Sequence, residues 1–312
     1  MQQTIAFYNI ENLFDVEDNP YTNDDDFLPT SDRHWTKRRY QRKIYKIGSA
    51  IAKIGKQETK HPPAIVGLAE IENDSVLEDL IHSPDLKRYD YGYVHYDSPD
   101  TRGIDVALLY NKKVFELTYS ERFTVFIEGE NGVRDYTRDI LLVTGLLEGE
   151  EMHFIVNHWP SRREGETQSA YKRLAAANMV MEILDNLKLN YENPKVIIFG
   201  DFNDNPDNES IRHLVKHELL FNPMETLLDL EHGSINFQFH WNLFDQILCS
   251  INFLETKTGT HKFDYAKIFN DKFLSQYKGK YSGQPYRTYV GKKYMGGFSD
   301  HFPVYILVKK IL

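Results

Sequence analysis

The sequence predicts an α+β fold in which buried β-strands and covering helices form layers. Short apolar runs rich in β-branched residues, each bounded by polar residues, are typical of core strands. Segments with helical periodicity lie between these runs, which favours a layered mixed architecture. The chain has 312 residues, of which 41% are hydrophobic and 13% aromatic, so it can bury a sizeable core and is too apolar for a disordered protein. Because it has no internal repeat and no long Pro, Gly or Ser linker, we expect a single domain over residues 1–312.

Four of the predicted core strands run directly into polar residues. These strands are expected at residues 5–8, 65–69, 154–156 and 196–200. The polar residues that follow them are Asn9, Glu70, the pair Asn157 and His158, and Asp201. Further strands are expected at residues 106–110, 123–126, 140–146, 244–248 and 304–308.

Two helices are predicted from apolar residues that recur at helical spacing. The first has an apolar stripe made of Tyr40, Ile44, Ile47, Ile51 and Ile54. The basic residues of segment 37–46 fall mostly outside this stripe, so we interpret them as a solvated face. The second helix is Ala-rich and covers residues 168–187. The acidic stretch 15–29, which contains proline, is expected to be a surface loop.

Charge is distributed unevenly along the chain. The net charge of −9 argues against a surface that binds polyanions nonspecifically. Residues 256–293, however, hold nine Lys or Arg and two acidic residues, interleaved with tyrosines and phenylalanines. Cations for phosphates and aromatic rings for base stacking suit a nucleic-acid surface; alternatively, the rings pack beneath a loop while the lysines stay solvated. We favour packing for the individual residues and expect this basic, aromatic-rich elaboration of the domain to border the substrate cleft.

Cysteine content and hydropathy exclude several classes of protein. The single cysteine, Cys249, excludes an internal disulfide and a Cys-rich zinc site, and its apolar neighbours indicate a buried, inert thiol. No apolar stretch approaches the ~20 residues that a membrane span needs. The N-terminus shows no signal-peptide pattern, so we expect a cytoplasmic protein, or a secreted or periplasmic one whose leader was removed. No obligate protein partner is evident.

Polar residues that could act in catalysis or metal binding flank the predicted strands, some after the end of a strand and others before its start. Those that follow apolar runs are Asn9, Glu70, His158, Asp201 and Asn203. Those that precede later runs are Asp245 and the pair Asp300 and His301. Unpaired buried charges are costly, and strand ends and strand starts share an edge in a sheet of mixed direction, so we expect all these groups to meet in one cleft.

The types of these residues indicate metal-assisted phosphate chemistry. Carboxylates and amides with few histidines and no thiolates favour Mg²⁺ or Mn²⁺ over zinc. No Walker-type GxxxxGK[ST] loop is present, which argues against nucleoside triphosphate hydrolysis of that kind. A divalent cation, an imidazole oriented by a carboxylate, and arginines together suit the attack of water on a phosphate ester.

The motifs that carry this chemistry also resemble a known family. They are, in chain order, Phe-Tyr-Asn-Ile-Glu-Asn-Leu from residue 7, Gly-Leu-Ala-Glu ending in Glu70, Asn157 with His158, Gly-Asp-Phe-Asn from residue 200, Asp245, and Ser-Asp-His from residue 299. This set resembles the endonuclease/exonuclease/phosphatase superfamily, the DNase I-like fold, over residues 5–308. Each motif alone is a weak signal, and their order makes the resemblance specific. The resemblance implies a four-layer α/β/β/α sandwich of two mixed β-sheets flanked by helices.

The resemblance also implies a metal site and substrate contacts. Glu70 would be the principal ligand of Mg²⁺ or Mn²⁺, with Asn9 and Asp300 completing or supporting the site. Arg102 resembles the phosphate-contacting arginine of DNase I-like proteins. Other predicted substrate contacts lie in the segment around His158, namely Asn157, Arg162 and Arg163. The planar fork of arginine suits phosphate, although two adjacent arginines are also common on a solvated surface.

The catalytic roles likewise follow from the resemblance. Asp201 would hold or deprotonate the attacking water, and Asn203 would orient Asp201 and the phosphate. Asp245 would stabilise a protonated His301, which would act as general base or bind a phosphoryl oxygen. His158 would protonate the leaving group.

We therefore expect a metal-dependent hydrolase of phosphate esters, most specifically a phosphodiesterase or nuclease that cleaves nucleic acid by in-line attack of water. Endonuclease and exonuclease modes both remain open. One alternative is a phosphoesterase of the same fold that acts on inositol phosphates, sphingomyelin or small nucleotides. An alternative of another class is an inactive binding or scaffold protein, against which the complete set of polar positions argues.

Overall fold

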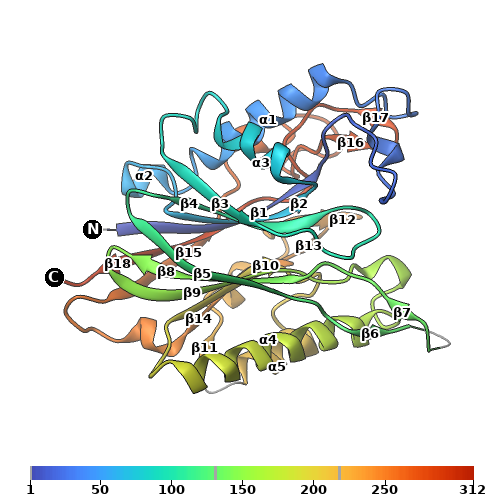
Figure 1. Cartoon of the computed structure of the whole chain (residues 1–312). Helices are drawn as coiled ribbons and strands as arrows, with labels where there is room; N and C mark the ends of the chain where they lie inside the picture. The colour runs from blue at the N-terminus through green and yellow to red at the C-terminus, as the bar shows by residue number, and fades with distance from the viewer. Residues whose placement is uncertain (1, 130–131, 217–218) are drawn as a thin grey trace.

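Two six-stranded β-sheets pack face to face and carry helices on their outer faces (Figure 1). The computed structural model describes residues 2–129, 132–216 and 219–312. The first sheet has the strand order β15-β18-β1-β2-β4-β3, and the second has the order β11-β14-β10-β9-β8-β5. Helices α1 and α3 cover the first sheet, and α4 and α5 cover the second (Figure 1). The predicted α+β class and four-layer sandwich are thus confirmed.

The bounds of the elements are as follows. The first sheet contains β1 (Gln2–Leu13), β2 (Ile65–Ile71), β3 (Tyr91–His95), β4 (Asp105–Asn111), β15 (His261–Ile268) and β18 (Val304–Lys310). The second contains β5 (Phe115–Phe123), β8 (Ile140–Leu147), β9 (Glu150–His158), β10 (Val196–Asp201), β11 (Leu220–Phe221) and β14 (Asp245–Ser250). Short two-stranded ribbons are formed by β6 (Ile127–Glu128) with β7 (Arg134–Asp135), β12 (Ile235–Phe237) with β13 (His240–Asn242), and β16 (Tyr289–Val290) with β17 (Lys293–Tyr294). The α-helices are α1 (Lys37–Ile51), α2 (Lys56–Thr59), α3 (Asp74–Ile81), α4 (Ala170–Asn190) and α5 (Glu209–Val215).

The two sheets share the same central arrangement of strands. In the first sheet, β1 pairs with β2 in parallel and with β18 antiparallel. In the second, β10 pairs with β9 in parallel and with β14 antiparallel. In each sheet, therefore, two strands end at the edge where a third strand begins.

Side chains that alternate along the strands build two cores. In β10, Ile197 and Phe199 point into the core between the sheets, whereas Val196 and Ile198 point into the core beneath α4. The rings of Phe7 and Phe199 meet across the sheets with their centroids 6.3 Å apart. A Cβ atom at Gly67 would lie 2.2 Å from the Phe199 ring. The two sheets therefore approach so closely here that only glycine fits at this position.

Both predicted helices form, with boundaries shifted by a few residues. In α1, Tyr40, Ile44, Ile47 and Ile51 are buried, as the apolar stripe predicts. In α4, the residues buried against the second sheet are Ala176, Ala177, Val180, Ile183, Leu184 and Leu187. Full burial of the valine, isoleucine and leucine side chains contributes about 1.5–3 kcal/mol each. Among the described residues, no helix is long and apolar enough to cross a membrane.

The structure also corrects the prediction of some strands. Of the strand predicted at residues 123–126, only Phe123 is in a strand, as the last residue of β5. The edge strands β3 and β15 were not predicted, because edge strands carry weaker apolar patterns than central ones. Cys249 is fully buried in β14, and burial raises the pKa of its thiol, so it is inert as predicted.

The basic segment 256–293 divides into an edge strand and a region beside the strand ends. β15 extends the first sheet by pairing with β18. Phe269 and Tyr289 are buried in the core, and Phe273 packs against it, whereas Tyr277 and Tyr281 are exposed. Most of these rings therefore pack, as we favoured.

Candidate active site

Six strands bring most of the predicted catalytic and metal-binding residues to one edge of the sandwich. β1, β2, β9 and β10 end at this edge, and the antiparallel strands β14 and β18 begin there. In the register of the second sheet, Asp201 lies opposite His158 on one side and Asp245 on the other. His301 precedes β18 and pairs with Ile235 through an isolated bridge.

Asn9 and Asp201 join the two sheets at this edge. The Asn9 side chain, which is 1% exposed, donates from Nδ2 to Oδ2 of Asp201 over 3.0 Å. Oδ1 of Asp201 accepts from the backbone N–H of Asn203 at 3.0 Å. Burial is the main cause that raises the pKa of Asp201 to about 6, against the opposing effect of His301. Asn203 has a left-handed backbone with φ 50°, and its amide donates to the Trp159 carbonyl at 3.0 Å, which fixes the turn after β10.

His301 and Asp245 form a buried ion pair across the sheets. His301 Nδ1 lies 2.7 Å from Oδ2 of the fully buried Asp245, and the other imidazole nitrogen, Nε2, lies 3.9 Å from Asp201. Burial alone would lower the pKa of His301, but Asp245, Asp201 and Asp300 outweigh burial and hold it well above its ordinary value. This charge environment therefore favours the imidazolium form of His301.

Glu70 is directed into the site by an irregularity at the end of β2. In a regular strand it would point away from the face that Gly67 and Ala69 share. The pairing of β2 with β4 shifts register between Ala69 and Ile71, however, and Glu70 has φ 68°. Its Oε2 accepts from the backbone N–H of Asn12 at 2.7 Å, and its Oε1 lies 4.0 Å from His158 Nε2 on the other sheet. A local backbone distortion thus supplies the predicted metal ligand.

His158 completes the link between Glu70 and Asp201. Its Nε2 lies 3.7 Å from Asp201 Oδ2, and within the described part of the chain its Nδ1 has no hydrogen-bond partner. Burial, reinforced by Arg138, Arg102 and His301, holds its pKa well below the ordinary value. The surroundings therefore favour the neutral form of His158 and the protonated form of His301.

A buried charge network adjoins the site, and its members Glu11, Lys43 and Arg287 were not predicted. Asp300 accepts a hydrogen bond from Arg287, and His301, Arg287 and Lys43 lower its pKa although burial opposes them. Lys43 Nζ donates to the Glu11 and Phe298 carbonyls at 3.1 and 2.6 Å. Burial is also the main cause that raises the pKa of Glu11 to about 7. Our interpretation of segment 37–46 as a solvated face is wrong for Lys43, which is 2% exposed.

The arginines predicted to bind substrate differ in whether they already make hydrogen bonds or ion pairs within the protein. Arg102 donates from Nη2 to Asn12 Oδ1 at 2.8 Å, and Asn12 also holds Glu70, so Arg102 lies beside the site. Arg163 is exposed and has no ion pair or hydrogen bond among the described residues. Burial is the main cause that lowers the pKa of Arg102 and of His158, and Arg163 adds to both shifts, so it is an unpaired cation close enough to the site to act on it electrostatically.

Arg162 and Asn157 are engaged elsewhere. The Arg162 guanidinium contacts four acceptors at 2.6–2.9 Å, and these are the Asn203 carbonyl, Asp204, Asn208 and Glu166. Asn157 is fully buried, accepts from Trp159 Nε1 at 3.0 Å and donates to the Ile155 and Phe199 carbonyls. It shares the outer face of β9 with Ile155, whereas His158 shares the inner face with Val156. The structure therefore does not bring Asn157 to the site and uses Arg162 to brace the loop after β10.

The donor set fits a hydrated divalent cation. Oε1 of Glu70 and Oδ1 of Asp300 accept no hydrogen bond from the described residues, and the two side chains are 13% and 23% exposed. The amide oxygen of the buried Asn9 accepts from the backbone N–H of Glu11 at 3.0 Å, and its second lone pair adds a third oxygen donor at this edge. Carboxylate and amide oxygens, completed by water, are the ligands of Mg²⁺ or Mn²⁺.

A pocket opens beside Asp300 and Arg287. It encloses about 330 Å³ and is lined by both of these residues and by the β12–β13 ribbon. Phe239 and Tyr281 stack in it with ring centroids 5.6 Å apart and an interplanar angle of 5°. Lys280 Nζ lies 5.0 Å from the centre of the Phe239 ring. The pocket therefore combines aromatic faces with positive charge next to the predicted metal site.

A two-sheet sandwich with acids, amides and histidines gathered at one edge defines a phosphoesterase of the DNase I-like class. The chain belongs to the Endonuclease/Exonuclease/phosphatase family, whose model matches residues 4–310. A search of curated proteins finds no significant match.

Solved structures share this fold over nearly the whole chain. A Bacteroides thetaiotaomicron endonuclease/exonuclease/phosphatase family protein is 20% identical with a TM-score of 0.62, covering 99% of this chain and 98% of that one. A mannosyl-6-phosphatase of the same organism is 19% identical with a TM-score of 0.59, covering 98% and 99%. The D. rerio protein TDP2, complexed with single-strand DNA product, is 13% identical with a TM-score of 0.56, covering 99% of both chains.

Proposed function

We propose that this protein is a divalent-metal-dependent phosphodiesterase that hydrolyses nucleic-acid phosphodiester bonds. The observation that carries the proposal is the position of the Asp201 carboxylate. Its Oδ2 lies 3.7 Å from Nε2 of His158 and 3.9 Å from Nε2 of His301, and the same His158 nitrogen lies 4.0 Å from Oε1 of Glu70. A base, a hydrogen-bond donor and a cation around one point suit the attack of water on a phosphate.

Each residue has a role that its protonation state supports. Asp201, with a pKa raised to about 6, orients the attacking water and accepts its proton. His301, kept protonated by Asp245, stabilises negative charge on a phosphoryl oxygen. Because a neutral imidazole is a poor proton source, we assign His158 to hydrogen bonding with the phosphate rather than to protonation of the leaving group.

Glu70, Asn9 and Asp300 would hold the cation. When bound, Mg²⁺ or Mn²⁺ supplies Lewis-acid polarisation of the phosphoryl group and neutralises the charge of the leaving oxygen. Arg102, beside Glu70, and the exposed Arg163 would hold the phosphate, because a guanidinium donates two parallel hydrogen bonds.

The pocket beside Asp300 supports a nucleotide as the group next to the scissile phosphate. Its volume of about 330 Å³ is near the lower end of ligand pockets, which suits one nucleotide better than a duplex. The stacked, half-exposed rings of Phe239 and Tyr281, with Lys280 above them, offer a stacking surface and a positive charge. TDP2, which shares the fold, was solved with single-strand DNA product.

A sugar phosphate is the second candidate substrate. Gln238, Gln276 and Gln284 also line the pocket, and amides beside aromatic rings suit sugar hydroxyls. One neighbour in fold is a mannosyl-6-phosphatase.

A chelator-controlled hydrolysis panel tests the proposal. It contains supercoiled DNA, single-strand DNA, RNA, bis-p-nitrophenyl phosphate, phosphoinositides and mannose 6-phosphate, each with Mg²⁺, with Mn²⁺ and with EDTA. We expect nucleic-acid cleavage that EDTA abolishes and that Asp201→Ala or His301→Ala lowers at least ~100-fold with the fold intact. Near-normal turnover by either folded variant would refute the assigned roles. Hydrolysis of mannose 6-phosphate without cleavage of nucleic acid would identify a sugar phosphate, rather than a nucleic acid, as the substrate.

A further inference from the structure

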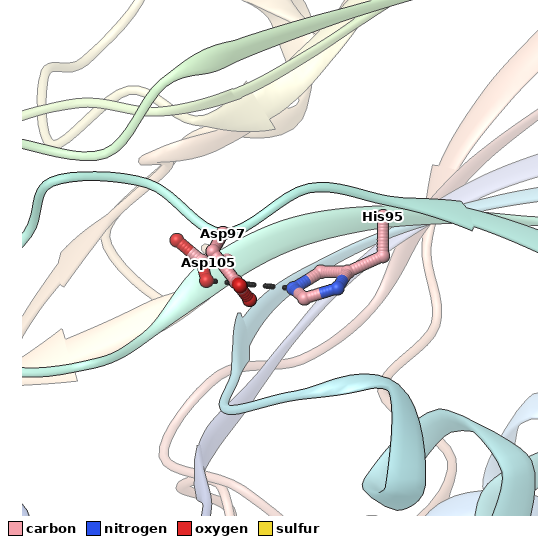
Figure 2. Close-up of side chains that lie close together, drawn as sticks. All are labelled: His95, Asp97 and Asp105. Atoms are coloured by element: carbon pink, nitrogen blue, oxygen red, sulfur yellow. Dashed lines mark ion pairs between the residues drawn. The ribbon is translucent and has the colours of Figure 1, made fainter.

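A second cluster of metal-ligating groups lies where β3 ends and β4 begins. His95 is the last residue of β3, Asp105 is the first residue of β4, and Asp97 lies in the loop between them. One ligand atom from each of the three lies within 4.8 Å of the other two. The imidazole and the two carboxylates gather around one point (Figure 2).

His95 is oriented as a metal-binding histidine is. Its side chain is 2% exposed, and Nδ1 lies 2.9 Å from Oδ1 of Asp74. Because a carboxylate accepts, Nδ1 carries the hydrogen in this contact. Nε2 is buried, makes no hydrogen bond in the described part of the chain, and faces Oδ2 of Asp105 at 3.4 Å, the ion-pair contact drawn in Figure 2. A carboxylate that fixes the ring and directs the other nitrogen toward the ion is a recurrent feature of metal sites.

Distance and charge both favour a cation at this point. His95 Nε2 and Asp105 Oδ2 are 3.4 Å apart, the separation of about 3.4 Å that two tetrahedral ligands have at bond lengths of about 2.0–2.1 Å. Asp139, which is 3% exposed, lines a small depression together with Asp105, and neither of its oxygens has a hydrogen-bond partner among the described residues. The neighbouring cation is Arg122, 3.5 Å from Asp139, so the cluster has excess negative charge.

The cluster is open to ions from solution. Asp97 is exposed, and with Asp105 it lines a depression of about 470 Å³ that Glu72 and Asp100 also border. An ion can therefore reach Asp97 and Asp105 from solution, with His95 behind them, and water can complete its coordination.

We propose that His95, Asp97 and Asp105 bind a divalent transition-metal ion, Zn²⁺ or Mn²⁺, distinct from the cation of the active site. One imidazole and two carboxylates suit these ions, whereas Mg²⁺ and Ca²⁺ prefer oxygen ligands alone.

The ion stabilises the loop that carries Arg102. Oδ1 of Asp105 accepts from the backbone N–H of Ser98 at 3.0 Å, and the Ser98 hydroxyl accepts from that of Asp100 at 3.4 Å. Asp100 in turn accepts from the backbone N–H of Arg102 at 2.7 Å. A cation that ties both ends of the loop to Asp97 therefore restrains the position of a substrate-binding arginine.

Calorimetric titration of the chelator-stripped chain tests the site. We titrate Zn²⁺ and Mn²⁺, with Mg²⁺ and Ca²⁺ in parallel, into the wild type and into His95→Gln, Asp97→Asn and Glu70→Gln. The wild type should bind one more Zn²⁺ or Mn²⁺ than His95→Gln, and Asp97→Asn should bind it at least ~10-fold more weakly. Asp97 is exposed, so its variant folds even where His95→Gln does not. Asp229→Asn, in the exposed Asp229–His232 pair, is the matched control and should leave the stoichiometry unchanged.

Hydrogen exchange supplies the second measurement. Saturating Zn²⁺, at about 100 times the Kd, should slow exchange in residues 96–104 by up to about 100-fold in the wild type and not in Asp97→Asn. The proposal is overturned if Asp97→Asn binds Zn²⁺ and Mn²⁺ as the wild type does, or if Glu70→Gln removes all binding. Either result is independent of which substrate the active site hydrolyses.

Discussion

Replacing Asp245 with asparagine tests whether the buried ion pair serves catalysis. The substitution keeps the volume and removes the charge that lies 2.7 Å from His301 Nδ1. The second oxygen of Asp245, Oδ1, is buried and accepts no hydrogen bond in the described residues, so the carboxylate depends on His301 for stabilisation. The variant should therefore lower the pKa of His301, because it removes the charge of Asp245, which does most to offset the effect of burial.

The magnitude follows from the distance. At 2.7 Å and an effective dielectric constant of about 20, the pair attracts by roughly 6 kcal/mol before desolvation is subtracted. Removing one member of a buried pair costs about 3–5 kcal/mol in measured cases. A loss of about 3 kcal/mol in the transition state lowers kcat roughly 150-fold, because each 1.36 kcal/mol is a factor of ten.

The assay is kcat on bis-p-nitrophenyl phosphate with saturating Mg²⁺, together with NMR of the ¹⁵N-labelled imidazole nitrogens across pH. Asp229→Asn is again the matched control, since it removes an aspartate 2.9 Å from a surface histidine, His232. The reasoning is refuted if folded Asp245→Asn keeps kcat within about threefold of the wild type or leaves the titration of His301 unchanged.

Three further predictions concern the metal, the arginines and acid stability. Glu70→Gln should lower kcat at least ~100-fold and weaken Mg²⁺ binding, measured by calorimetry with the thermal midpoint as a folding control; unchanged Mg²⁺ affinity would exclude Glu70 as a ligand. Arg163→Met should lower kcat/KM about tenfold without shifting the midpoint, whereas Arg162→Met should shift the midpoint downward because it unties the loop after β10; the reverse pattern would contradict their assignment. Burial lowers the pKa of His153 to about 4, so the folded state binds fewer protons than the unfolded state between pH 6.5 and 4, and the free energy of unfolding should fall by up to about 3 kcal/mol as pH drops through this window. Urea titrations of His153→Asn should show a flatter pH dependence, and an unchanged slope would show that His153 is protonated without cost.

The convergence of the active site could be predicted because its signals are local. Asn9, Asp201 and Asp245 lie at the ends of apolar runs, and such runs mark strands in any sequence. Asn157 could have been excluded on the same grounds, because alternation along β9 places it on the opposite face from His158.

The charge network around Asp300 could not be predicted because its contacts are long-range. Lys43 meets Thr288 from 245 positions away, and Glu11 meets the backbone of Thr288 across 277 positions. No periodicity in α1 distinguishes Lys43 from its solvated neighbours. The bulge that directs Glu70 is likewise invisible in sequence, since regular alternation predicts the other face for this residue.

The close approach of Gly67 to Phe199 makes the layer between the sheets a determinant of activity. Half of the reacting groups belong to one sheet and half to the other, so their alignment depends on how far apart the two halves of the sandwich stand. A larger residue deep in this layer, remote from water and from substrate, would displace the reacting groups of one sheet relative to those of the other without changing any reacting residue. Inactive variants of this enzyme should therefore include apolar replacements that are still folded.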